Sequence, residues 1–237
     1  MSKLILDIET IGDDFDVLDK TTQESLTQWI KKESANEKEY QEELEELKNR
    51  MGFSPLTGQI VAIGVLDYEK DKGVVYFQAP GEKISEFTEG NFTFKPMPEK
   101  EMLQSFWQGA QAYTEFISFN GRQFDAPFLA IRSAIHQIKI SKDLLSNRYV
   151  NSQKFGTTHI DLLDQLTFYG ALRGKRSLHL WCHAFGIESP KAGGVTGDDV
   201  AGLFKEKKFA DIARYNTGDL IATKKLYDYW MNYVRAG

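Results

Sequence analysis

The sequence has one cysteine, six prolines and no long apolar run. Cys182 has no second thiol to pair with, so an intrachain disulfide is excluded and a reducing compartment is expected. No stretch approaches the roughly 20 apolar residues of a membrane-spanning helix. The N-terminal run LILDIE is too short and too acidic for a secretory signal. These absences predict a soluble, cytoplasmic protein with no membrane partner, and they leave protein partners unknown.

The chain also lacks an excess of positive charge. It has 29 Lys and Arg against 34 Asp and Glu, which gives a formal net charge of −5. A generally basic coat for nucleic acid is therefore excluded, but a nucleic-acid enzyme is not, because a basic groove can lie on an acidic body. Zinc-binding spacing is missing as well, since the single cysteine and four histidines form no convincing ligand pattern.

What the chain does have is apolar sequence for a sizeable core, with 41% hydrophobic residues among 237. Strands paired as a hairpin, followed by strands interleaved with helices, predict an α/β fold with a mixed sheet flanked by helices. We expect a single domain over 1–237, with a Glu-rich helical insertion at about 13–52. The predicted elements are a hairpin over 59–80, helices over 99–113 and 126–140, a strand over 115–120, a strand and helix over 157–170, and a long helix over 209–234.

Two acids, Asp7 and Glu9, follow the first apolar run of the chain. Residues two apart in a strand point to the same face, so both carboxylates are aimed at one place. Like charges that close repel each other, and a fold tolerates them most easily with a cation between them. A metal site and a strand that ends in a solvated acidic loop both fit this stretch alone.

Three further acids and a tyrosine lie at the edges of predicted elements or inside the last predicted helix. Asp125 falls between a strand and a helix, where the commonest role is the N-cap of that helix. Tyr215 and Asp219 are four apart and share one helix face, but singly they fit a half-buried tyrosine and a solvated acid. Asp161, in HIDLL, has the position of a structural acid at a helix start.

Taken in order, Asp-x-Glu at the N-terminus, Asn-x4-Asp mid-chain and Tyr-x3-Asp in the last long helix resemble the DEDD (DnaQ-like) superfamily of 3′–5′ exonucleases. The tyrosine is typical of the subgroup with the proofreading domains of family-B DNA polymerases. The chain is most similar to predicted stand-alone exonucleases related to those domains. The segments LDIET, GQIVAIGV, SFNGRQFDAPFL, HIDLLDQL and RSLHLWCHAFGI follow the same order, over nearly the whole chain except the 13–52 tract.

The resemblance implies a ribonuclease-H-like fold and a two-metal 3′–5′ exonuclease. Its substrate would be nucleic acid with a free 3′ end, single-stranded and with DNA favoured, and its products nucleoside 5′-monophosphates. Two divalent cations, Mg²⁺ or Mn²⁺, suit carboxylate ligands because hard ions prefer oxygen. Tyr215 would orient the attacking water; a neutral tyrosine, with a pKa of about 10, cannot be the sole base. The metal ligands implied by the family pattern are Asp7, Glu9, Asp125 and Asp219.

Seven more residues are candidates for substrate contact: Thr10, Asn120, Phe124, Arg173, Lys175, Arg176 and Lys191. The two polar ones flank motif acids and fit the 3′-terminal nucleotide, although turn and cap hydrogen bonds fit them too. The phenylalanine either stacks on a base or packs in the core. The basic cluster at 173–176 contacts phosphates or lies in a solvated loop. The last lysine matches a family lysine.

Two alternatives to this function stay open. An RNA 3′-end trimming exoribonuclease of the same superfamily fits equally, because no motif identifies contacts to the 2′-hydroxyl group. A catalytically silent nucleic-acid-binding module on the same fold would be expected to have lost a motif acid. This chain keeps all four and the tyrosine.

Overall fold

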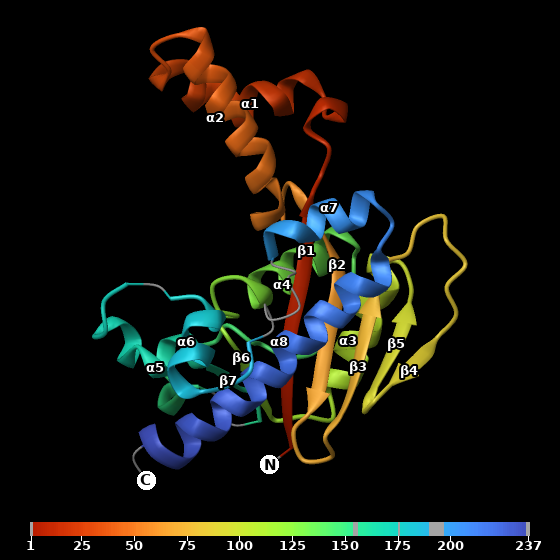
Figure 1. Ribbon diagram of the computed structural model, residues 1–237, viewed down its shortest axis with the longest axis vertical. Coiled ribbons are helices and arrows are strands. Elements are labelled where there is room, and N and C mark those ends of the chain that lie inside the picture. Colours follow the sequence, from red (N-terminus) through yellow and green to blue (C-terminus); the bar gives the residue numbers. More distant parts are fainter. Residues whose placement is uncertain (1, 154–155, 175, 190–196, 236–237) are drawn as a thin grey trace.

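The computed structural model describes residues 2–153, 156–174, 176–189 and 197–235. Its centre is a seven-stranded sheet in the order β4-β5-β3-β2-β1-β6-β7 (Figure 1). Strand β1 pairs antiparallel with β2 and parallel with β6, so the sheet is mixed, and the predicted α/β class is confirmed. The strands are β1 (Lys3–Gly12), β2 (Gly58–Asp67), β3 (Lys72–Phe77), β4 (Phe87–Glu89), β5 (Phe92–Pro96), β6 (Glu115–Ser118) and β7 (Thr158–Asp161).

Strand β1 lies inside the sheet, and each of its faces is covered by a hydrophobic core. Leu4, Leu6 and Ile8 join one hydrophobic core, while Ile5 and Ile11 join the other. Side chains alternate along a strand, so the acids at positions 7 and 9 share the face of Ile5 and Ile11. The strand therefore carries two carboxylates into the layer between the sheet and the helices on that face.

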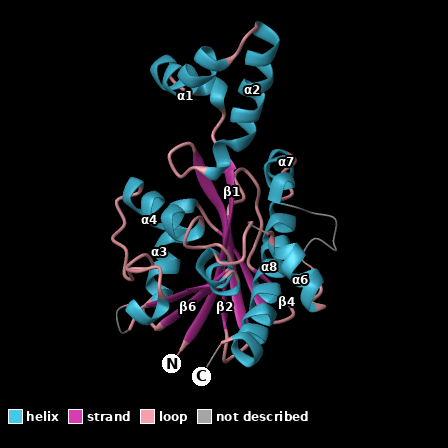
Figure 2. Ribbon diagram, turned by 90° about the vertical axis from the view of Figure 1, so that its left-hand side faces the viewer, coloured by secondary structure: helices cyan, strands magenta, loops and turns pink. Residues whose placement is uncertain are grey.

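Helices cover both faces of the sheet, and Figure 2 shows α3 and α4 on one side and α8 on the other. Each contributes an apolar stripe to the core beneath it, such as Phe106 of α3 and Leu220 of α8. Within the described ranges, no helix is long and apolar enough to cross a membrane. These helices are α3 (Glu99–Ala110), α4 (Asp125–Ile135) and α8 (Phe209–Tyr229), and the shorter ones are α5 (Leu162–Leu166), α6 (Leu178–Phe185) and α7 (Val200–Lys205).

The Glu-rich tract is helical, as predicted, and forms two helices, α1 (Lys20–Glu33) and α2 (Glu37–Arg50), which project beyond one end of the sheet (Figures 1 and 2). No residue of α2 is fully buried, as its polar composition predicts. The chain re-enters the core at Met51, which is 2% exposed and opens the short 3₁₀ helix η2 (Met51–Phe53). The insertion is thus held at its base.

Two sequence predictions differ from the structure. The helix expected over 126–140 ends at Ile135, because Gln137 adopts a left-handed φ of 59°. Strands β4 and β5 were not predicted; they form a hairpin through Gly90, whose φ is 57°, and β5 extends the sheet beside β3. Both differences lie away from the acids of the motifs.

Candidate active site

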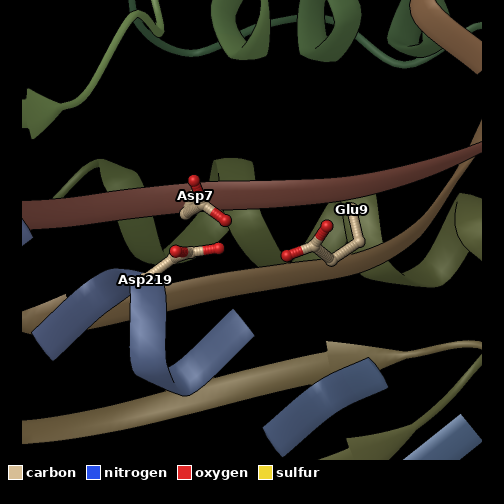
Figure 3. A group of neighbouring side chains, drawn as sticks. All are labelled: Asp7, Glu9 and Asp219. Carbon is tan, nitrogen blue, oxygen red and sulfur yellow. The ribbon is translucent and has the colours of Figure 1, made fainter. Parts of the chain in front are cut away.

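Strand β1 and helix α8 bring three acids from the two ends of the chain together. Asp7 and Glu9 project from β1 toward α8, and Asp219 projects from α8 toward them (Figure 3). One carboxylate oxygen from each lies within 4.8 Å of the others. The spacing predicted from strand and helix periodicity therefore produces a cluster, and the solvated-loop alternative for the first two acids is wrong.

Asp125 adjoins this cluster from the other side of β1. It is the first residue of α4, and its buried carboxylate accepts a hydrogen bond from the backbone N–H of Ile8 at 3.0 Å. Strand β6 pairs with β1 only up to Ile5, so beyond that point the side chain of Asp125 supplies the acceptor that the strand lacks. Phe124 occupies the N-cap position instead, and the N-cap role considered for Asp125 is wrong.

Among the described residues, no positive charge is a cause of the pKa shifts of Asp7 and Glu9. Burial, and then the negative charges of Asp219, Asp125 and Glu9, raise the pKa of Asp7 well above its ordinary value. Burial and the charge of Asp219 do the same to the pKa of Glu9. Burial is also the main cause that raises the pKa of Asp125 to about 7. The cluster is therefore short of positive charge in the absence of a metal ion.

Asn216 is a site residue that the sequence analysis missed. Its side chain is fully buried, and its Nδ2 donates to Oδ2 of Asp7 at 2.7 Å and lies 3.4 Å from Oε1 of Glu9. Its Oδ1 has no hydrogen-bond partner among the described residues. That oxygen faces Gly64 of β2, where a Cβ would lie only 1.8 Å away. In the sequence, the feature that could have identified Asn216 is its position directly after Tyr215 in the predicted helix.

Tyr215 lies one helical turn before Asp219 and is half-buried beside the acids. Burial is the largest cause that raises the pKa of its hydroxyl, followed by the charges of Asp219, Glu9 and Asp7 and a hydrogen bond with Asp219. The phenol therefore keeps its proton at neutral pH. In this state it can donate one hydrogen bond and accept another.

Asp161 organises the turn that leads to α4. Its Oδ1 accepts from the backbone N–H groups of Asn120 and Leu163, and its Oδ2 accepts from that of Arg122. The structural role predicted for it is confirmed. Asn120 has a left-handed φ of 62°, and its buried Oδ1 lacks a hydrogen-bond partner among the described residues. A contact between Asn120 and substrate stays a prediction.

The other substrate candidates are spread over the molecule. The hydroxyl of Thr10 donates to the carbonyl of Gly52 at 2.7 Å, and Phe124 lines the cavity that also contains Glu9. Arg173 and Arg176 are exposed and do not line that cavity. Lys175 and Lys191 lie outside the described residues. Phosphate contact by this basic loop therefore stays a prediction.

The donor set fits a hard divalent cation. Three carboxylates converge, a fourth adjoins them, and no thiolate or imidazole belongs to the group. Mg²⁺ and Mn²⁺ take oxygen ligands of this kind, and their charge would relieve the repulsion that raises the pKa values. The residues that can hold such ions are Asp7, Glu9 and Asp219, with Asp125 beside them.

Comparisons with known proteins agree with this geometry. Residues 53–235 match the model of a family described as "predicted 3′–5′ exonuclease related to the exonuclease domain of PolB". This match begins after the strand with Asp7 and Glu9, so their place in the site comes from the structure. No curated protein matches the chain.

The fold is similar to that in a solved structure of the family B DNA polymerase from the hyperthermophilic archaeon Pyrobaculum calidifontis. The TM-score is 0.59 and the identity 16%, over 97% of this chain and 24% of the polymerase chain. This chain thus spans about a quarter of the polymerase. At that identity the likeness concerns the fold alone, and it confirms the ribonuclease-H-like α/β architecture.

Proposed function

Because the chain belongs to the family of predicted 3′–5′ exonucleases related to the exonuclease domain of PolB, we propose that it is a metal-dependent phosphodiester hydrolase. It acts on free 3′ ends of single-stranded nucleic acid in the cytoplasm, favours DNA and releases nucleoside 5′-monophosphates. The whole chain serves as one domain, with α1 and α2 as an insertion. The observation that carries the proposal is the cluster of Asp7, Glu9 and Asp219, in which one carboxylate oxygen of each lies within 4.8 Å of the others.

Two divalent cations, Mg²⁺ or Mn²⁺, would be held by Asp7, Glu9 and Asp219, with Asp125 as the fourth ligand. Bound there, they would lower the pKa of a water molecule and neutralise charge on the phosphoryl and leaving oxygens. The carboxylates of Glu9 and Asp125 are already buried in the fold, so they lose little hydration when they bind. The repulsion among them would be exchanged for attraction.

The other side chains of the site hold the carboxylates and strand β1 in place and orient the attacking water. Asn216 fixes the carboxylate of Asp7 through its 2.7 Å hydrogen bond, so that this oxygen keeps its direction. Tyr215 stays protonated, because its pKa is raised, and its hydroxyl orients the attacking water. Asp125 holds the edge of β1 through Ile8 and so keeps the strand beside α4. Each of these roles requires a fixed geometry, which the buried helix α8 and the central strand provide.

A polarity assay tests the proposal. Purified protein is given 5′-labelled and 3′-labelled single-stranded DNA and RNA, with Mn²⁺ or with EDTA. We expect a ladder of shortened 5′-labelled products that requires metal. Release of a 5′-labelled mononucleotide as the first product would contradict the proposed polarity.

Matched variants assign the activity to the site. Asp219→Asn should abolish the ladder, whereas Asp211→Asn, an exposed acid on the same helix, should not. Faster cleavage of RNA than of DNA would identify the exoribonuclease instead. Binding of either polymer without hydrolysis in any divalent metal would indicate the silent module.

A further inference from the structure

A cavity of about 860 Å³ lies beside the carboxylates, where the helical insertion leaves the sheet. Its floor is residues 8–12 of β1 and includes Glu9. One wall is built by α2 and η2 of the insertion, and residues of α7 line it as well. Its volume falls in the range of about 300–1,000 Å³ in which proteins bind small molecules and cofactors. The cavity is therefore large enough to receive part of a nucleotide chain next to the acids.

Phe53 lines this cavity with an unusually open side chain. It is 59% exposed, although it is large and apolar. Its ring centroid lies 6.4 Å from that of Phe124, with the two rings at 64° to each other. An aromatic face that remains open beside a charged site is the kind of surface on which a nucleic-acid base stacks.

The backbone around Phe53 is firmly fixed to β1. The carbonyl of Gly52 accepts the hydroxyl of Thr10 at 2.7 Å, and a Cβ at Gly52 would lie 2.9 Å from the backbone nitrogen of Gly12. The preceding Met51 is 2% exposed. The ring is thus held by a rigid base, and a partner that stacks on it need not order a loose loop first.

Electrostatic attraction is a poor explanation for strand binding in this cavity, because its lining has more acids than lysines. The acids are Glu9, Asp13, Asp14, Asp16 and Glu45, and the lysines are Lys48 and Lys205. The ammonium group of Lys48 is also paired already, at 3.3 Å from Asp16 and 3.4 Å from Glu45. A strand in this position must be held mainly through its bases.

We propose that the cavity receives the second nucleotide from the 3′ end of a single strand, and that the ring of Phe53 stacks on its base. The inference rests on the proposed exonuclease function. Phe124 directly precedes Asp125 and is partly buried against the core, so Phe53, farther from the acid motif and more exposed, is the ring available to a base outward of the terminal nucleotide. The insertion thereby becomes part of the substrate-binding surface, and the acidic lining disfavours the second strand of a duplex.

Binding of a 5′-fluorescein-labelled oligothymidylate, measured by fluorescence anisotropy in Ca²⁺, tests this contact directly. Phe53→Ala should raise Kd by about 5- to 150-fold, the usual effect of removing one stacked aromatic side chain. Phe53→Trp should restore affinity, because it restores an aromatic face. The matched control is Leu56→Ala in the same loop, which is 75% exposed and does not line the cavity. Equal affinities for Phe53→Ala and Leu56→Ala would overturn the inference.

Steady-state kinetics separate this inference from the proposed function. The p-nitrophenyl ester of thymidine 5′-monophosphate presents a terminal nucleotide without a second base. Phe53→Ala should raise the KM for the oligonucleotide far more than that for the ester, with the main change in KM and not in kcat. If wild type cleaves neither substrate in Mn²⁺, the proposed function fails. If wild type cleaves both and the two KM values of Phe53→Ala change equally, only the stacking assignment fails.

Discussion

Two groups of carboxylates in this fold are held in opposite ways. Glu99, at the start of α3, is 6% exposed and lies against Arg132, His136 and the backbone N–H of Ile60 at 2.7–2.9 Å. Burial alone would raise its pKa, but these hydrogen bonds outweigh burial and lower it. In the acidic cluster on β1 and α8, the donors among the described residues include the amide of Asn216 and the hydroxyl of Tyr215, and the pKa values of Asp7 and Glu9 are raised.

This difference distinguishes a structural carboxylate from a functional one. A buried acid that already has a guanidinium and several donors is satisfied, and it joins the elements around it. A group of buried acids that mainly face one another is destabilising unless something positive enters from outside. The second pattern is the one typical of a ligand site.

The largest expected difference between the two groups of carboxylates is in their effect on the cleavage rate. Asp7→Asn should lower the rate of 3′-end cleavage by several orders of magnitude, because it removes a metal ligand without changing the shape of the side chain. Glu99→Gln should leave the rate per folded molecule near that of wild type, since α3 lies on the other face of the sheet from α8. Initial rates on a 5′-labelled oligonucleotide in Mn²⁺ measure both. A small loss for Asp7→Asn would remove this residue from the site.

The same two variants should affect stability in the opposite order, with the larger loss in Glu99→Gln. Glu99→Gln should lower the free energy of unfolding by about 3 kcal/mol, because it leaves Arg132 without its carboxylate in a largely buried position. Asp7→Asn should leave the metal-free protein as stable as wild type or more stable, since one repelling charge is gone. Urea unfolding in EDTA measures both. Equal losses in the two variants would mean that the clusters do not differ as described.

Tyr215→Phe should separate metal binding from the orientation of the attacking water. We expect kcat to fall by about 10²-fold, the usual contribution of one positioned proton-donating or proton-accepting group. Mn²⁺ binding, followed by the shift in melting temperature, should persist because the carboxylates are unchanged. A fully active Tyr215→Phe variant would leave the tyrosine with packing alone.

Metal ions should stabilise wild type by mass action. At a hundredfold excess over Kd the gain is about 2.7 kcal/mol. Asp7→Asn should gain much less, whereas Glu99→Gln should gain as much as wild type, because its cluster is not involved. Thermal melts across a Mn²⁺ series give these values, and an identical gain in wild type and Asp7→Asn would show that the ion binds elsewhere.

The two clusters should also give a pH dependence of stability of opposite sign. Acids with a raised pKa bind protons in the folded state that the unfolded chain has released, so metal-free stability should fall as pH rises from about 5 to 8. The slope is about 1.4 kcal/mol per pH unit for each such proton. Glu99, with its lowered pKa, contributes stability throughout this window and loses it only in more acidic solution. Asp125→Asn should flatten the profile in EDTA, and a profile identical to that of wild type would contradict the shift.

Local patterns predicted the elements that carry the motif residues, because strand and helix periodicity are properties of short stretches. They did not predict that Asp125 of α4 accepts a hydrogen bond from the backbone N–H of Ile8 in β1. An acid before a helix is interpreted as an N-cap unless the position of the neighbouring strand edge is known. Asn216 and Glu99 were missed for the same reason. Their partners lie far away in the chain, on β1 and on α4.

Gly64 is a requirement of the site that lies outside the motif acids. Helix α8 lies so close to β2 that a methyl group at Gly64 would overlap the side chains of Asn216 and Leu220. An alanine there would therefore force these two side chains to move, and Asn216 is the residue that holds the carboxylate of Asp7. The absence of a side chain on β2 is thus as much a condition of the arrangement as the acids on β1 and α8.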